Sequence, residues 1–260
     1  MGSAKKQGEL WNQAPENWAY IQEPHHNPLF EAMLNATEVS EGTRFLDVGC
    51  GGGGASLLAA ERGAKVSGLD AAGGLINVAR ERIPSGDFRV GDLQYLPFED
   101  DSFEVGFAAN SIQYAADRVA ALRELKRVCV SGGRVTVGLF APPEKVAFNA
   151  IQRAVRSTLP EPPKGKVPYE LSAPGKLEAL FEEAGLQIIE SGEVDCPQSI
   201  PDFETYWRGH SSAGPFRNRL RIVGEEKLRA VTSEALEPFR KDDGSYSIGP
   251  NIFKYVVAST

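Results

Sequence analysis

The feature that most constrains this chain is a glycine-rich stretch directly after a short apolar run. Residues 45–48 are Phe-Leu-Asp-Val, and residues 49–54 contain five glycines. A run typical of a helix follows, from Ala55 to Arg62. Glycine permits positive φ and lets a ligand approach the backbone closely. A strand, a glycine-rich turn and a helix in this order hold nucleotide-like cofactors in open α/β sheets. The sequence therefore predicts an α/β fold with a cofactor site at this turn.

The glycines alone leave the class of cofactor open. Gly49, Gly51 and Gly54 match the G-x-G-x-x-G pattern of dinucleotide binders, so an NAD-type oxidoreductase is one alternative. A dinucleotide would bring a diphosphate to this turn, close to the carboxylate of Asp47. S-adenosylmethionine (SAM) has no phosphate and carries a cationic sulfonium and ammonium, so it suits Asp47 better. A further alternative is that Asp47 only accepts hydrogen bonds from the turn.

Further carboxylates lie where later strands are expected to end. Four more apolar runs predict strands, at residues 65–70, 88–93, 103–110 and 134–140. Asp70 ends the first of these, 23 residues after Asp47, and Asp92 lies in the second. In doubly wound folds ligands bind at the carboxyl ends of the strands, and an acid at this position accepts hydrogen bonds from ribose hydroxyls. We therefore expect the three carboxylates at one edge of a parallel sheet.

The remaining patterns complete a doubly wound, mostly parallel sheet of seven strands. The sixth and seventh strands are predicted at residues 186–193 and 252–258. Two helices are expected within residues 9–36, and Asn27-Pro28 opens the second because proline suits a first helical turn. Asp117 is expected to cap a helix that Gly132-Gly133 stops, and a further helix is expected between Ser172 and Gly185.

Residues 43–140 resemble the core of class I SAM-dependent methyltransferases, of the small-molecule type related to quinone C-methyltransferases. The matching segments are LDVGCGGG (46–53), GLD (68–70), GDLQYLPFEDDSFEVGFAANSIQY (91–114) and RELKRVCVSGGRVTVGLF (123–140). The resemblance implies a Rossmann-like fold that binds SAM and releases S-adenosylhomocysteine (SAH). It implies these cofactor-binding residues: Asp47, Gly49, Gly51, Gly53, Asp70, Ala71, Asp92, Leu93 and Asn110. Asp70 would bind the ribose hydroxyls, Asp92 the adenine amino group, and Asn110 would lie near the methionine portion.

The segments outside this core are expected to cover the methyl acceptor. We interpret residues 1–260 as a single methyltransferase domain with a SAM-binding core at 43–140. An N-terminal helical cap at 9–36 and insertions at 141–171 and 196–247 would form the lid; the alternative is that they only extend the core. The first insertion contains a proline-rich loop at residues 159–165.

The expected reaction is transfer of a methyl group to a small-molecule metabolite by in-line displacement. A base is needed only when the acceptor arrives protonated. The candidate catalytic residues are His25, His26 and Tyr114. The candidate substrate-binding residues are Tyr20, Gln113, Tyr206, Trp207 and His210. A protein that binds SAM or SAH without transferring a methyl group is the remaining alternative, and the sequence leaves the acceptor atom and the oligomeric state open.

Composition narrows the partners. A net charge of −7 and a pI of about 5.2 argue against nucleic acid, which needs a basic face. The basic run Arg217–Arg221 is interpreted as a solvated helix face. The sequence has no run of 18 apolar residues, so no membrane span is predicted. The three cysteines lack metal-ligand spacing, so we expect no metal and no disulfide. With no apolar signal segment at the N-terminus, a cytoplasmic location is expected.

Overall fold

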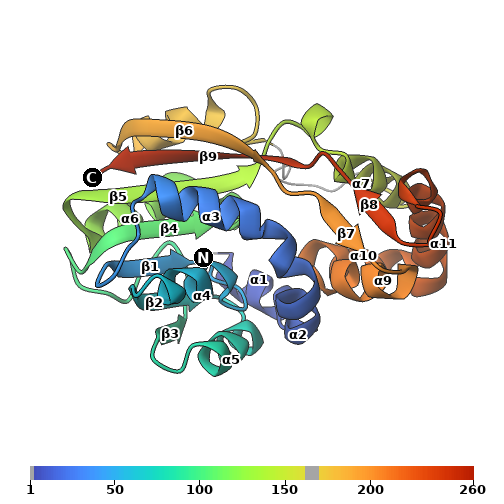
Figure 1. Ribbon diagram of the computed structural model, residues 1–260, viewed down its shortest axis with the longest axis horizontal. Coiled ribbons are helices and arrows are strands. Elements are labelled where there is room, and N and C mark those ends of the chain that lie inside the picture. Colours follow the sequence, from blue (N-terminus) through green and yellow to red (C-terminus); the bar gives the residue numbers. More distant parts are fainter. Residues whose placement is uncertain (1–2, 162–169) are drawn as a thin grey trace.

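A seven-stranded sheet forms the centre of the molecule, as the computed structural model of residues 3–161 and 170–260 shows (Figure 1). Its strands are β1 (Arg44–Val48), β2 (Lys65–Asp70), β3 (Asp87–Val90), β4 (Phe103–Ala109), β5 (Cys129–Phe140), β6 (Gln187–Asp195) and β9 (Ile252–Ser259). They lie in the order β3-β2-β1-β4-β5-β9-β6. The first five are parallel, and β9 pairs antiparallel with both β5 and β6. The predicted doubly wound, mostly parallel sheet of seven strands is confirmed.

Helices cover both faces of this sheet. They are α3 (Asn27–Ala36), α4 (Gly54–Glu61) and α5 (Gly73–Arg82) on one face, and α6 (Arg118–Val128) and α8 (Lys176–Glu183) on the other. Phe45 of β1 packs into the core beneath α3, α4 and α5, and the next residue, Leu46, packs into the core beneath α6 and α8. This alternation follows from the two-residue period of a strand, and it explains why β1 is apolar on both sides.

The N-terminal region consists of more and shorter elements than predicted. They are α1 (Ala4–Trp11), α2 (Pro15–Asn17), a π-helical turn η1 (Trp18–Gln22), a 3₁₀ turn η2 (Glu23–His26) and then α3. The expectation of two helices is wrong, because Pro15, Pro24 and Pro28 each open a new element where a longer helix would need a backbone N–H donor. The predicted helix start at Asn27 is confirmed.

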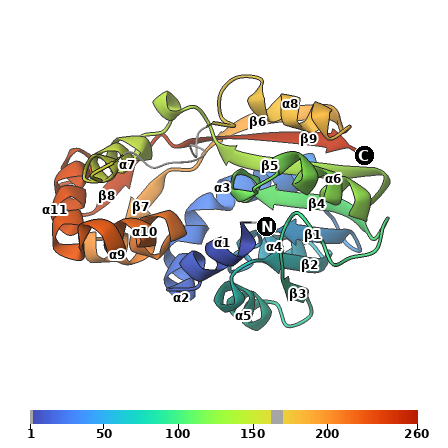
Figure 2. The same ribbon diagram turned by 180° about the vertical axis from the view of Figure 1, so that it is seen from behind.

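A second, mainly helical module lies at one end of the sheet, beside α1 and α2 (Figures 1 and 2). It contains η4 (Pro143–Lys145), α7 (Phe148–Ser157), β7 (Gln198–Ile200), α9 (Phe203–Ser212), α10 (Gly214–Val223), α11 (Glu225–Leu236), η5 (Glu237–Phe239) and β8 (Tyr246–Ile248). Its strands β7 and β8 pair antiparallel, a ribbon that the sequence did not reveal. The module has its own apolar core around Ile151, Tyr206 and Leu236. Of the predicted proline-rich loop, residues 162–165 lie outside the described residues.

Two predicted boundaries moved. β3 ends at Val90, so Asp92 lies in the loop after the strand and not within it. Helix α6 begins at the predicted cap Asp117, whose carboxylate accepts the Ala120 N–H at 2.9 Å, but it ends at Val128 and not at Gly132-Gly133. The chain becomes extended at Cys129 because this residue already pairs with Phe103 of β4.

None of the helices in the described ranges combines the length and the apolar character needed to span a membrane.

Candidate active site

The glycine-rich loop after β1 forms one wall of a cavity at the carboxyl ends of the parallel strands. Gly49 has a φ of +78°, and a Cβ there would collide with the side chain of Ser111. Gly51 has a φ of +56°, and a Cβ there would lie 2.7 Å from Oε1 of Glu23. Both positions combine a left-handed backbone with close packing, so glycine is required at each. The loop therefore brings its backbone against the cavity.

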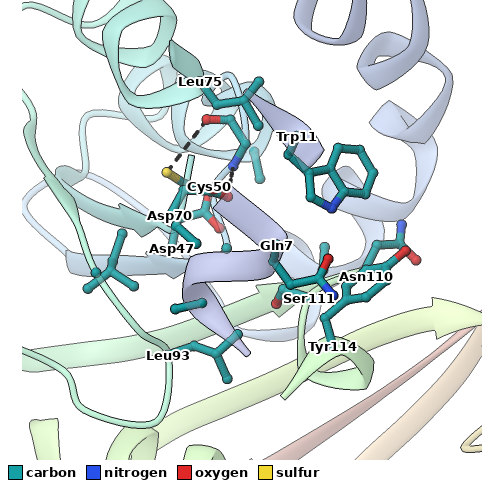
Figure 3. A pocket seen from close by; sticks show the side chains of 18 of the residues that line it. Gln7, Trp11, Asp47, Cys50, Asp70, Leu75, Leu93, Asn110, Ser111 and Tyr114 are labelled. Carbon is teal, nitrogen blue, oxygen red and sulfur yellow. Dashed lines mark hydrogen bonds between the residues drawn. The ribbon is translucent and has the colours of Figure 1, made fainter. Parts of the chain in front are cut away.

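Three carboxylates from neighbouring strand ends line this first cavity, as predicted. Asp47 is only 2% exposed, and its Oδ2 accepts a hydrogen bond from the Ser56 hydroxyl at 2.8 Å. Asp70 accepts the backbone N–H of the glycine loop at Gly51 (3.0 Å), and Figure 3 shows it beside Asp47. Asp92 accepts the N–H of Gln94 at 3.0 Å. Each carboxylate thus accepts a hydrogen bond from a nearby chain segment and also lines the cavity.

The charged side chains that line the first cavity are acidic. Its lining, among the described residues, contains no lysine or arginine. Burial raises the pKa of Asp47 to about 7, the Ser56 hydrogen bond opposes this, and the charges of Glu23 and Asp70 add to it. Burial also raises the pKa of Asp70. A cationic ligand would favour the ionised form of both groups. The cavity encloses about 880 Å³, including space open to solvent.

A buried ion pair fastens the N-terminal region to the glycine loop. Oε1 of Glu23 accepts the N–H of Gly52 at 2.9 Å, and Oε2 lies 2.8 Å from Nη1 of Arg82. The same guanidinium nitrogen donates to the carbonyl of Gly52 at 2.8 Å. Burial raises the pKa of Glu23 to about 7, against the opposing charge of Arg82. The sequence reasoning missed this contact because its partners are 29 and 59 residues away.

A second cavity lies between the sheet, the N-terminal region and the helical module. Its lining combines aromatic and apolar side chains with two arginines, and comprises Trp11, Trp18, Gln22, His26, Asn110, Gln113, Tyr114, Leu139, Phe140, Phe148, Gln152, Arg156, His210, Ala213, Pro215, Phe216 and Arg219. It encloses about 930 Å³, again including space open to solvent. Segments far apart in the sequence therefore meet around one space.

Five of the described residues line both cavities, namely Trp11, Trp18, His26, Asn110 and Tyr114. The rings of Trp11 and Trp18 lie 4.6 Å apart, and those of Trp11 and Tyr114 lie 6.0 Å apart. Figure 3 shows Trp11, Asn110 and Tyr114 across the first cavity from Asp47 and Asp70. Asn110, at the end of β4, has a φ of +52°, and its buried Oδ1 has no hydrogen-bond partner among the described residues. This shared wall is where ligands in the two cavities would meet.

Most residues expected to bind the cofactor lie together around the first cavity. Those that line it are Asp47, Gly49, Gly51, Asp70, Ala71, Asp92, Leu93 and Asn110. Gly53 does not line it; a Cβ there would lie 3.1 Å from the Cβ of Ala79, so this glycine serves the close packing of α4 on α5. The side of Gly53 that would carry a Cβ therefore faces a neighbouring helix, and its contact with the cofactor stays a prediction.

The catalytic and substrate candidates divide into two groups. His26 and Tyr114 line both cavities, and Gln113 and His210 line the second. His25, Tyr20, Tyr206 and Trp207 line neither. Their expected roles are not supported: Tyr20 is 58% exposed with Arg82 over its ring, while Tyr206 and Trp207 are buried in the core of the module.

The histidines differ in environment. Burial lowers the pKa of His26 to about 4, and the charge of His25 adds to this. Burial also lowers the pKa of His25. His210 stacks on Phe148 with a ring separation of 4.6 Å, and its Nε2 lies 3.2 Å from Oε1 of Gln198. Burial lowers the pKa of His210 well below its usual value, so neither His26 nor His210 is a cation at neutral pH.

The interpretation of Arg217–Arg221 as a solvated helix face is wrong for one residue. Arg219 is only 8% exposed and lines the second cavity. Phe216, one turn earlier on α10, is buried and lines the same cavity. The available sequence signal was the spacing of Phe216 and Arg219, because residues three positions apart lie on the same side of a helix. Arg156 and Gln152 on α7 carried no comparable sequence pattern.

The described residues contain no cluster of three or more histidine, cysteine, aspartate or glutamate side chains arranged to hold a metal ion.

Comparisons with known proteins place the chain in a family. Residues 46–137 match the model of a methyltransferase domain. The methyltransferase GfsG of Streptomyces halstedii is 31% identical over 240 residues, which cover 77% of this chain and 82% of that one. The chain belongs to the class I SAM-dependent methyltransferases, and SAM is its cofactor.

Two further comparisons concern a part of the sequence and the fold. The malonyl-[acyl-carrier protein] O-methyltransferase of Serratia marcescens is 35% identical over 111 residues, which cover 43% of this chain but only 44% of that one. A SAM-dependent methyltransferase from Aquifex aeolicus has a similar structure, with a TM-score of 0.56 at 16% identity, and the match covers 95% of this chain and 98% of that one. The latter likeness concerns the fold.

Proposed function

We propose that this enzyme transfers the methyl group of SAM to a small organic molecule bound in the second cavity. The observation that carries the proposal is the wall of five residues common to both cavities. A cofactor in the first cavity and an acceptor in the second would meet at this wall. Close positioning of the two reactants is the main requirement of a displacement at an already activated carbon.

The first cavity fits SAM in charge and shape. Asp70 would accept hydrogen bonds from the ribose hydroxyls, and Asp92 would accept one from the adenine amino group, with Leu93 beside it. Asp47 would face the cationic methionine end. Two observations support this fit: the lining has no basic side chain in the described part of the chain, and the buried Oδ1 of Asn110 lacks a partner there.

Bound SAM supplies an electrophilic methyl group on its sulfonium sulfur. In-line transfer of this methyl group leaves SAH. The chain contributes orientation and exclusion of water. Trp11, Trp18 and Tyr114 close the shared wall with aromatic surface. His26 is neutral at pH 7 because burial lowers its pKa to about 4. Its ring can therefore accept a hydrogen bond from a hydroxyl or amine of the methyl-accepting substrate without bringing positive charge near the sulfonium.

The N-terminal cap and the two insertions would act as the cover of the acceptor site. Trp11 and Trp18 come from the first, Phe148 and Gln152 from the second, and Phe216 from the third, and all line the second cavity. The core at 43–140 contributes Asn110, Gln113, Tyr114, Leu139 and Phe140 to the same lining. Acceptor choice is therefore expected to depend on segments outside the core.

The test is to trace the transferred methyl group. The protein is incubated with [methyl-¹⁴C]SAM and separate pools of metabolites, nucleic acids and proteins. Label in the metabolite pool supports the proposal. Label that remains in nucleic acid, or in protein after cleavage of thioesters, would refute the small-molecule assignment. Binding of SAH by calorimetry without label transfer to any pool would favour a SAM-binding protein that transfers no methyl group.

A further inference from the structure

Two arginines of the second cavity have no acidic partner in the described part of the chain. Arg219 on α10 donates from Nη1 to Oε1 of Gln152 at 2.9 Å, and Arg156 on α7 donates from Nη2 to Oδ1 of Asn149 at 2.9 Å. Within residues 3–161 and 170–260, no aspartate or glutamate forms a salt bridge with either guanidinium. The two amides orient the guanidinium groups, but being neutral they leave the positive charges uncompensated.

The two cavities therefore have opposite charge. Glu23, Asp47, Asp70 and Asp92 line the first, whose described lining has no arginine or lysine. The described lining of the second has Arg156 and Arg219 and no acid. The chain as a whole carries a net charge of −7, so an acid-free pocket with two arginines is contrary to its general composition.

An unpaired cation is costly where it is buried. Arg219 is 92% shielded from solvent, as its exposed fraction of 8% implies. Burial lowers the pKa of Arg219 to about 10, and the charge of Arg156 lowers it further, so the group stays protonated at neutral pH. Removing a charge from water without an opposite charge destabilises a folded protein. Such a group in a cavity is typical of a ligand-binding residue.

The rest of the second cavity suits a flat apolar body. Its aromatic lining outside the shared wall comes from Phe140, Phe148, Phe216 and His210. Phe148 stacks with His210 at an interplanar angle of 23°. Gln113 also lines the cavity, and its buried Oε1 has no partner among the described residues, so it offers an acceptor to a ligand hydroxyl or amine.

We propose that the methyl acceptor is an organic acid with an aromatic or other flat apolar body, and that Arg219 and Arg156 bind its carboxylate. The guanidinium fork matches the two oxygens of a carboxylate, which makes arginine the suitable residue for this contact. The inference rests on the proposed role of the second cavity as the acceptor site, and it adds the chemical class of the acceptor. Neither arginine lines the first cavity, so the carboxylate of the methyl acceptor would be held away from the aspartate and glutamate side chains that line the cofactor site.

The experiment measures binding of matched acid and amide pairs to the full chain saturated with SAH. The probes are benzoate and benzamide, 2-naphthoate and 2-naphthamide, and indole-3-acetate and indole-3-acetamide, with 2-naphthyl phosphate as a further anion. Quenching of tryptophan fluorescence reports occupancy because Trp11 and Trp18 line the cavity. Since a hydrogen bond to a charged group contributes tenfold to hundredfold in affinity, at least one acid is expected to bind about tenfold more tightly than its amide.

Arg219→Met keeps the length of the side chain and removes its charge. It should abolish the preference for the acid, leave SAH affinity unchanged, and leave the melting temperature equal or higher, because an uncompensated buried charge is lost. Arg221→Met on the same helix is the matched control, since Arg221 is exposed and lines neither cavity. This control should retain the preference for the acid.

Three outcomes would overturn the proposal while SAH still binds: equal affinity of every acid and its amide, no binding of any acid, or an unchanged preference in Arg219→Met, whatever the melting temperature of that variant. Tighter binding of the phosphate than of 2-naphthoate would replace the carboxylate by a phosphate. Failure of the wild-type protein to bind SAH would instead refute the proposed function itself.

Discussion

The most direct test of the cofactor site is the pH dependence of SAM binding. Burial raises the pKa of Asp47 to about 7 in the protein without ligand. A nearby cation favours the ionised carboxylate and lowers this pKa in the complex. Binding should then release a proton below pH 7, and SAM affinity should increase as the pH rises through 7. The perturbation is a change from pH 6 to pH 7.5. This range stays below the usual pKa of about 7.7–8.0 of an α-amino group, such as that of SAM, so the change in affinity is assigned to the protein's carboxylates.

The magnitude follows from the fraction of ionised Asp47. With a pKa of about 7, about one molecule in eleven is ionised at pH 6 and about three in four at pH 7.5. If only the ionised form binds well, affinity increases about eightfold, which corresponds to ~1.2 kcal/mol. Burial also raises the pKa of Asp70, so a second proton can steepen the dependence.

Titration calorimetry at both pH values, in two buffers of different ionisation enthalpy, measures the affinity and the released proton together. Asp47→Asn should reduce the pH dependence and weaken binding at pH 7.5 to about the level of the wild type at pH 6, or below. Asp242→Asn, in an exposed turn, is the control and should behave like the wild type. A wild-type affinity that stays constant from pH 6 to pH 7.5, or an equally steep dependence in Asp47→Asn, would refute the reasoning.

Three further predictions follow from the same contacts. Asp47 has a folded-state pKa above its unfolded value, so its stabilising contribution is full below about pH 4 and is lost as the pH rises through 7. Asp47→Asn should therefore raise the unfolding free energy of the ligand-free protein at pH 7.5 by up to about 4 kcal/mol, as measured by urea denaturation. Gly51→Val should place its Cβ against Glu23 and strain a left-handed backbone, so circular dichroism should stay near that of the wild type while calorimetry shows loss of SAM binding; normal binding would contradict it. Glu23→Ala leaves Arg82 without its carboxylate and should lower the unfolding free energy by about 3 kcal/mol, whereas the exposed Glu9→Ala should change it by less than about 0.5 kcal/mol.

The sequence determined the cofactor half of this enzyme. Strand β1, the glycine loop and α4 are contiguous, so local pattern alone predicted them. The carboxyl ends of parallel strands share one edge of a sheet, and this rule was sufficient to bring Asp47, Asp70 and Asp92 around one cavity. The glycine pattern did not predict that a Cβ at Gly53 would face Ala79 of α5, because such a pattern does not distinguish a position that faces a ligand from one that faces a helix.

Only the tertiary structure decided the acceptor half. Arg219 lies in a basic run that is otherwise partly exposed, and its burial depends on how α10 packs against α1, α9 and α11. Its guanidinium also donates to Gln152 of α7. Glu23 pairs with Arg82, and β7 pairs with β8 across three intervening α-helices and the 3₁₀ turn η5. Each pairing joins segments with no common local pattern. Local sequence fixes hydrogen bonds and periodicity within an element, but the charge and shape of a cavity between elements depend on which residues distant in the chain face it together.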